Sequence, residues 1–90
     1  MKFERRIVYG ERARSDWMKI VRDLKHSRVR PYTYVIVKKD DSGRMEMYHN
    51  ASFLKYPARV CGYTVIGVAE GRTEGLEVIR KLVAADYGTE

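Results

Sequence analysis

The chain has 90 residues, of which 44% are hydrophobic and 33% charged, and its net charge is +6. This length is that of one small domain, and the composition excludes the disordered and collagen-like classes. The single cysteine, Cys61, excludes an internal disulfide framework, so we expect one domain over residues 1–90 and a cytoplasmic location. No apolar run is long enough for a signal peptide or a membrane span, so we expect no membrane partner.

The positive charge is concentrated in the first third of the chain. Residues 1–30 contain ten lysines and arginines against four acidic residues, whereas residues 31–90 contain eight of each. A localised basic surface indicates a polyanionic or acidic partner more directly than a high isoelectric point does.

Two elements are predicted in this basic third. The period-two spacing of Phe3, Ile7 and Tyr9 predicts a strand over Lys2–Tyr9. From Arg12 to Ser27 the apolar spacing becomes that of an amphipathic helix. The helix is expected to end before Pro31, because the residue that precedes a proline avoids the α conformation.

The next part of the chain predicts a β-hairpin. Aromatic and β-branched residues fill Tyr32–Lys38, and a turn rich in aspartate separates this strand from Met45–His49. In the connection that follows, over Asn50–Arg59, Phe53 and Leu54 are expected to pack against the core.

A last strand and a last helix complete the predicted order. The strand covers Val60–Val68, and Gly62 and Gly67 within it indicate a bulge or a close approach of another backbone. Helical spacing over Thr73–Tyr87 predicts the final helix, and Thr73 can cap its first turn.

The order β-α-β-β-β-α predicts an α+β fold, a two-layer sandwich in which an antiparallel sheet of three or four strands carries both helices on one face. We expect a single core, formed by Trp17, Ile20, Val21, Leu24, Val35, Val37, Ile66, Val68, Leu76, Ile79, Leu82 and Val83.

The first predicted helix has an almost purely cationic flank. The flank and its extension beyond the helix consist of Arg14, Lys19, Arg22, Lys25, Arg28 and Arg30. Arg5, Arg6 and Arg12 are expected to approach it from the first strand and the following loop. Such a flank is typical of contacts to nucleic-acid phosphates, and six contacts predict a slope of log K against log salt of about −5. A solvated helix face and a docking face for an acidic protein remain open as alternatives.

Four tyrosines of the predicted strands have two interpretations. Stacking of unpaired bases and ordinary cross-strand packing both fit Tyr32, Tyr34, Tyr48 and Tyr63, and packing is the commoner role.

Catalytic and metal-binding patterns are missing from the sequence. Cys61 and His49 form the one nucleophile and base pair that adjacent strands could bring together, and no orienting acid accompanies them. Cys61 is expected to be a buried structural residue. Two histidines and one cysteine lack the spacing of metal ligands, so we expect no metal, no cofactor and no enzymatic activity.

Two resemblances add expectations. From Ala13 to Tyr87 the order α-β-β-β-α resembles that of the double-stranded RNA-binding domain. The last helix of that family opens with a lysine cluster, whereas Arg72–Glu77 has one cation and two acids, so no binding residue is carried over. The segment Tyr63–Glu77 (YTVIGVAEGRTEGLE) is similar to small uncharacterised Firmicutes proteins of plasmids and phages, which implies an accessory protein of a mobile element.

The sequence therefore predicts a small basic binding module that contacts nucleic acid through the cationic flank. The alternative is an accessory regulator or inhibitor that binds an acidic or nucleic-acid-binding protein surface. A homodimer is also expected, because a small core leaves Tyr32–Val37 or Met45–Tyr48 partly uncovered at a sheet edge or outer face.

Overall fold

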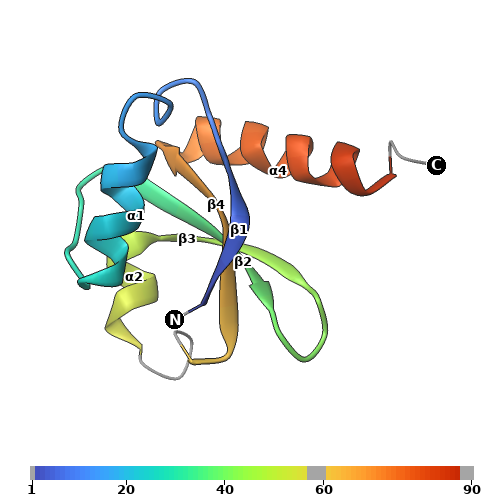
Figure 1. Cartoon of the computed structure of the whole chain (residues 1–90), viewed down its shortest axis with the longest axis horizontal. Coiled ribbons are helices and arrows are strands. Elements are labelled where there is room, and N and C mark those ends of the chain that lie inside the picture. The colour runs from blue at the N-terminus through green and yellow to red at the C-terminus, as the bar shows by residue number, and fades with distance from the viewer. Residues whose placement is uncertain (1, 57–60, 88–90) are drawn as a thin grey trace.

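The computed structural model of the protein describes residues 2–56 and 61–87. The elements follow the order β1 (Lys2–Tyr9), α1 (Trp17–Lys25), β2 (Thr33–Lys39), β3 (Met45–His49), α2 (Asn50–Lys55), β4 (Tyr63–Glu70) and α4 (Arg72–Tyr87). The α+β class is confirmed, since one four-stranded sheet carries helices packed against it (Figure 1). The predicted first strand, the hairpin and the last helix are all present.

The sheet is mixed, with the strand order β1-β4-β2-β3. β2 runs antiparallel to β3 and β4, but β1 runs parallel to β4, so the prediction of a wholly antiparallel sheet is wrong for β1. β2 and β4 occupy the centre because both of their faces are apolar. In β2, for example, Val35, Ile36 and Val37 are consecutive and all fully buried.

The helices cover opposite faces of the sheet. In Figure 1 the strands fan out from the centre, with α1 and α2 on one side and α4 on the other. The chain crosses to the second face at Gly71, whose positive φ of 98° lets it turn sharply from β4 into α4. The predicted two-layer arrangement with both helices on one face is therefore wrong, and the fold has three layers.

Two apolar clusters replace the single predicted core. The cluster under α1 and α2 consists of Ala13, Ile20, Leu24, Val35, Val37, Phe53, Val65 and Val68, with Trp17 packed against it. The cluster under α4 consists of Ile36, Ile66, Ala69 and Val78, with Ile79 and Leu82 packed against it.

The side of α4 that faces the sheet differs from the predicted side. Leu76 and Val83 are 47% and 41% exposed, so their assignment to the core is wrong. The buried side carries Glu74 and Val78 instead. Glu74 accepts backbone hydrogen bonds in the interior, and this rotates the helix away from the centre of its apolar arc.

Two local differences concern the other helices. α1 begins at Trp17 and ends at Lys25, so it is shorter than the predicted helix over 12–27, and residues 11–16 form turns. α2 was not predicted; it interrupts the expected α-β-β-β-α order. Its residue Phe53 is fully buried and Leu54 is partly buried, as expected. Val60, the predicted start of β4, lies outside the described residues.

The two sheet edges differ in regularity. β1 pairs with β4 at Phe3 and again at Val8, with a bulge between them that holds Arg5 and Arg6. A charged bulge of this kind blocks pairing with another strand. β3 forms the other edge and pairs regularly with β2, so Met45–Tyr48 lies at a sheet edge. The other segment expected at an edge or outer face, Tyr32–Val37, belongs mostly to β2, which is central. The homodimer stays a prediction.

Gly67 allows α4 to lie close to the sheet. We expect Gly67→Ala to lower the free energy of unfolding by about 2 kcal/mol, because its Cβ would lie 2.8 Å from Val78 Cγ1 and 3.2 Å from the Val8 carbonyl oxygen. Gly75→Ala is the control. Its Cβ meets only the flexible side chain of Met47, and alanine favours a helix over glycine by about 1 kcal/mol. Urea denaturation measures both, and a Gly67→Ala variant as stable as the Gly75→Ala variant would contradict this packing.

Candidate nucleic-acid interface

The outward face of α1 is cationic. Ile20 and Leu24 are fully buried and fix the orientation of the helix. With 100° between successive residues, the side opposite them carries the exposed residues Met18, Lys19, Arg22, Lys25 and His26. Among them Lys25 is held with its Nζ 5.3 Å from the centre of the Phe3 ring, a cation–π contact. No acidic residue lies on this outward face; Asp16 and Asp23 lie at its flank.

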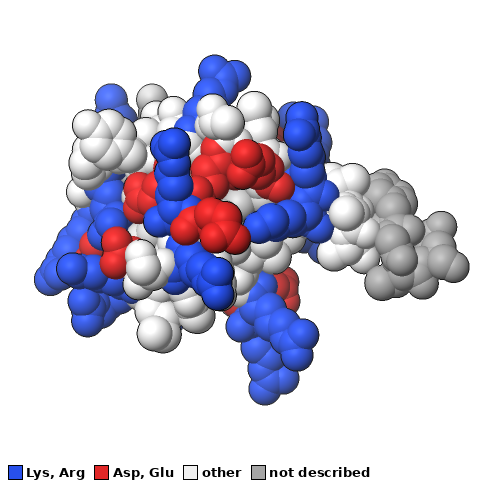
Figure 2. All heavy atoms as spheres, turned by 90° about the horizontal axis from the view of Figure 1, so that it is seen from above, with Lys and Arg blue, Asp and Glu red and all other residues white. Residues whose placement is uncertain are grey.

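The charges of the neighbouring surface are more mixed. Figure 2 shows acidic side chains gathered in the middle of the face seen from above, with lysines and arginines standing around them. Cations also gather at the left end, which is the end that carries α1 in Figure 1. The outward face of α1 is therefore one part of a surface on which many other cations lie near acids.

Two of the predicted phosphate-binding residues lie just outside α1. Arg14 precedes the helix, so its predicted position on the helix wheel is wrong; its Nη1 lies 3.8 Å from a Glu11 carboxylate oxygen. Arg28 follows the helix and lies 3.8 Å from Asp23. Their side chains are 72% and 68% exposed, so both remain available to a ligand.

The three predicted flanking arginines do not join this face as a group. Arg6 lines a hollow together with Lys38, Met45, Ile66 and Leu82, on the side of the sheet that α4 covers. The guanidinium of Arg12 lies beside Gly71, at the turn between β4 and α4. Arg5 is exposed within the β1 bulge.

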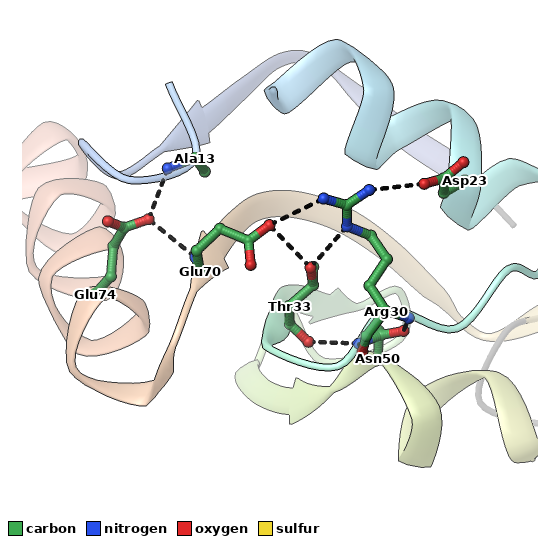
Figure 3. Close-up of polar contacts among 7 residues, drawn as sticks. All are labelled: Ala13, Asp23, Arg30, Thr33, Asn50, Glu70 and Glu74. Carbon is green, nitrogen blue, oxygen red and sulfur yellow. Dashed lines mark hydrogen bonds and ion pairs between the residues drawn. The ribbon is translucent and has the colours of Figure 1, made fainter. Parts of the chain in front are cut away.

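Arg30, by contrast, is part of the internal framework (Figure 3). Its Nη1 donates to Asp23 of α1 at 2.7 Å, its Nε to Thr33 of β2 at 3.0 Å, and its Nη2 to Glu70 of β4 at 3.4 Å. Its side chain is only 22% exposed. The hydrogen bond from Arg30 lowers the pKa of the Asp23 carboxyl, so this ion pair persists to lower pH than the ordinary aspartate pKa would allow. The prediction that Arg30 contacts phosphate is therefore not compatible with its partners here.

Asn50 fixes the backbone on both sides of Pro31. Its side-chain oxygen accepts from the Arg30 amide at 2.7 Å, and its Nδ2 donates to the carbonyls of Arg30 and Thr33, both at 2.7 Å. Asn50 is fully buried, and the bonds use both of its donors and its acceptor. The first residue of α2 thus holds the loop that leads from α1 to β2.

Glu74 holds the turns that lead into α1. Its carboxylate accepts from the amides of Arg12, Ala13 and Glu70, and Glu74 itself is only 6% exposed (Figure 3 shows the bonds from Ala13 and Glu70). Gly10 permits this approach, because a Cβ there would collide with the Glu74 side chain. These long-range contacts leave no periodic signal in the sequence, which is why Asn50 and Glu74 were missed as framework residues.

The structure separates the four tyrosines that the sequence placed in strands, since Tyr32 lies just before β2. Tyr34 packs edge-on against His49, and Tyr48 packs with Phe53 and Tyr63. Tyr32, in contrast, is 72% exposed. Three of these tyrosines therefore have the ordinary packing role, and one has its ring in solvent.

Tyr48 also donates a hydrogen bond to Glu46. This bond raises the pKa of Tyr48 to about 12 and lowers the pKa of Glu46. The contribution of this hydrogen bond to the stability of the fold requires a neutral Tyr48, and it is complete below the ordinary tyrosine pKa of about 10. It is lost as the pH rises toward 12.

The structure gives no support to Cys61 and His49 as a nucleophile and base pair. Cys61 is exposed, so its prediction as a buried structural residue is wrong. Both ring nitrogens of His49 have structural partners: Nε2 lies 2.8 Å from the Pro31 carbonyl, and Nδ1 accepts from the Ala51 amide at the start of α2. Over residues 2–56 and 61–87 there is no cluster of side chains that could hold a metal ion, and no helix that is long and apolar enough to cross a membrane.

We expect Arg30→Ala to lower the free energy of unfolding by about 2 kcal/mol, because Thr33 and Glu70 lose a charged donor in a half-buried setting. Arg28→Ala is the matched control and should change it by less than about 0.5 kcal/mol, since Arg28 is exposed. Urea denaturation measures both. In acid titration the Arg30→Ala midpoint should move to higher pH, because the lowered pKa of Asp23 stabilises the fold only above that pKa. Equal effects of the two variants would contradict the framework role of Arg30.

Comparison with known proteins gives no further guide to the site. No family model, curated protein or solved structure matches the chain. The function of the cationic face is therefore inferred from the residues that form it.

Proposed function

We propose that the protein is a non-enzymatic module that binds nucleic acid through the outward face of α1. The observation that carries this proposal is the placement of Lys19, Arg22 and Lys25 on one side of a helix, exposed and with no acid among them. Lysine and arginine side chains on such a face bind phosphates and release condensed counterions.

The support beneath this face favours a rigid binding surface. Ile20 and Leu24 anchor α1 in the apolar cluster, and Asp23 ties it to β2 and β4 through Arg30. Because the cations project from a fixed helix, they lose little backbone freedom on binding. Contacts to phosphate carry no sequence information directly, so the expected affinity is modest and largely independent of sequence.

The structure changes the expected number of contacts. Arg30 is removed because it is engaged inside the protein. Arg14 is left out because an exposed acid, Glu11, lies beside it, whereas the acid beside Arg28 is Asp23, which Arg30 already binds. Lys19, Arg22, Lys25 and Arg28 remain as the principal set. Four phosphate contacts on duplex DNA give a slope of log K against log salt of about −3.6, shallower than the slope that six contacts would give.

A second candidate function is docking to an acidic protein surface. One observation favours it: Met18 is 69% exposed in the middle of the cationic face. An apolar side chain contributes little to phosphate binding, but it can enter a pocket on a protein partner.

The test is a charge reversal with a matched control. Arg22→Glu with Lys25→Glu should weaken binding of labelled duplex DNA or RNA about tenfold or more and bring the salt slope to about −1.8. Arg80→Glu with Lys81→Glu makes the same change in net charge on α4, across the sheet, and should leave the slope near −3.6. Fluorescence polarisation between about 50 and 200 mM salt measures both.

Two results would contradict the proposal. One is no affinity of the unmodified protein for DNA or RNA at about 50 mM salt. The other is equal weakening by the two double reversals, which would indicate an effect of net charge alone. A pull-down that captures an acidic protein with the unmodified chain and not with the α1 reversal would then support the second candidate.

A further inference from the structure

Tyr32, which directly precedes β2, differs from Tyr34, Tyr48 and Tyr63 in having an exposed ring on a fixed backbone. It is 72% exposed, although it lies next to Thr33, which is fully buried. The Tyr32 carbonyl accepts from the Gly71 amide at 2.7 Å. A large aromatic side chain in solvent contributes little to folding, and its ring face is open to a ligand.

The hydrogen bonds around Tyr32 hold its backbone on both sides. Asn50 bonds the amide and carbonyl of Arg30 and the carbonyl of Thr33, and His49 bonds the carbonyl of Pro31. Every residue from Arg30 to Thr33 thus has a backbone carbonyl in a hydrogen bond to another element or its cap. A ring presented from such a segment is preorganised, because its backbone order is already set before any ligand arrives.

The segment that carries Tyr32 lies close to α1 and to one cation. Figure 1 shows the loop after α1 turning back beside that helix before β2 begins, and Arg30 joins Asp23 of α1 to Thr33. Lys19 is one helical turn before Asp23 on α1. The Arg12 guanidinium lies beside Gly71, the residue whose amide bonds the Tyr32 carbonyl.

We propose that Tyr32 is a stacking platform for an unpaired base, so that the α1 site accepts single-stranded nucleic acid. This inference rests on the proposed function and names its substrate class. Bases stack on exposed aromatic rings while neighbouring cations follow the phosphate backbone. A base inside a duplex cannot reach the ring in this way, because its faces are covered by its neighbours.

The experiment compares a labelled oligothymidine of about 12 nucleotides with a duplex of similar length. Tyr32→Ala should weaken binding of the single strand about tenfold and leave duplex binding within about twofold. Tyr32→Phe, which keeps the ring, should bind the single strand within about twofold of the unmodified protein. Tyr56→Ala removes another exposed tyrosine, at the end of α2, and should have no effect on either probe.

Failure of this inference is distinct from failure of the proposed function. If Tyr32→Ala binds the single strand as well as the unmodified protein does, while the Arg22 and Lys25 reversal weakens it, the stacking platform is wrong and the α1 site stands. Equal weakening of single-strand and duplex binding by Tyr32→Ala would also overturn the stacking role. If the unmodified protein binds neither probe, both proposals fail. Circular dichroism confirms that each variant is folded.

Discussion

The guanidinium of Arg30 takes partners from three elements, and the place of α1 on the sheet depends on them. It bonds Asp23 on α1, Thr33 on β2 and Glu70 on β4 within one half-buried cluster. A guanidinium withdrawn from water is tolerated only when its donors are used. Thr33 adds a hydrogen bond to Glu70, so the cluster has cross-links of its own. Of the side-chain nitrogen and oxygen atoms that are buried in the described residues, none lacks a partner.

The Arg30 cluster also distinguishes the charged groups that stabilise the fold from those that are exposed to a ligand. Asp23 lies at the flank of the cationic face, and Arg30 and Arg28 both lie within ion-pair distance of it. Arg30 binds Asp23 at 2.7 Å from the interior, which is closer than Arg28 at 3.8 Å, so the main partner of this acid is an internal arginine. Glu74 acts in a comparable way at the other end, where its carboxylate is used by backbone amides. Lys19, Arg22 and Lys25 of α1, in contrast, are exposed.

Local features of the sequence predicted most elements but not their arrangement. Residue spacing located β1, the hairpin and α4, because alternation and helical periodicity are properties of neighbouring residues. The consecutive apolar residues of Val35–Val37 and Val65–Val68 are typical of strands that are buried on both faces. We nevertheless expected a single core on one face of the sheet. The parallel pairing of β1 depends on contacts between distant residues, and no local pattern contains it.

The candidate site was predictable to a similar extent. Lys19, Arg22 and Lys25 fall on one side of any helix through Trp17–Lys25, so their grouping followed from the sequence. The start of α1 could not be predicted in this way. The amides of Arg12 and Ala13, in the turns before the helix, donate hydrogen bonds to the carboxylate of Glu74, which lies more than sixty residues away in the sequence. Arg30 was grouped with its exposed neighbours because its partner Glu70 lies forty residues away in the sequence and is brought to it only by the fold. The exposure of Tyr32 likewise depends on Gly71 and Asn50.

In the proposed complex, nucleic acid contacts the outward face of α1 and Tyr32 while the Arg30 cluster stays intact. Amide chemical-shift mapping of the isotopically labelled protein with an oligothymidine single strand tests this binding mode. We expect the largest shifts over α1 and around Tyr32, with the amides of Arg30 and Ala51 still protected from hydrogen exchange. Shifts confined to α4 or to the Arg5 and Arg6 bulge of β1, or loss of protection at Arg30, would contradict it.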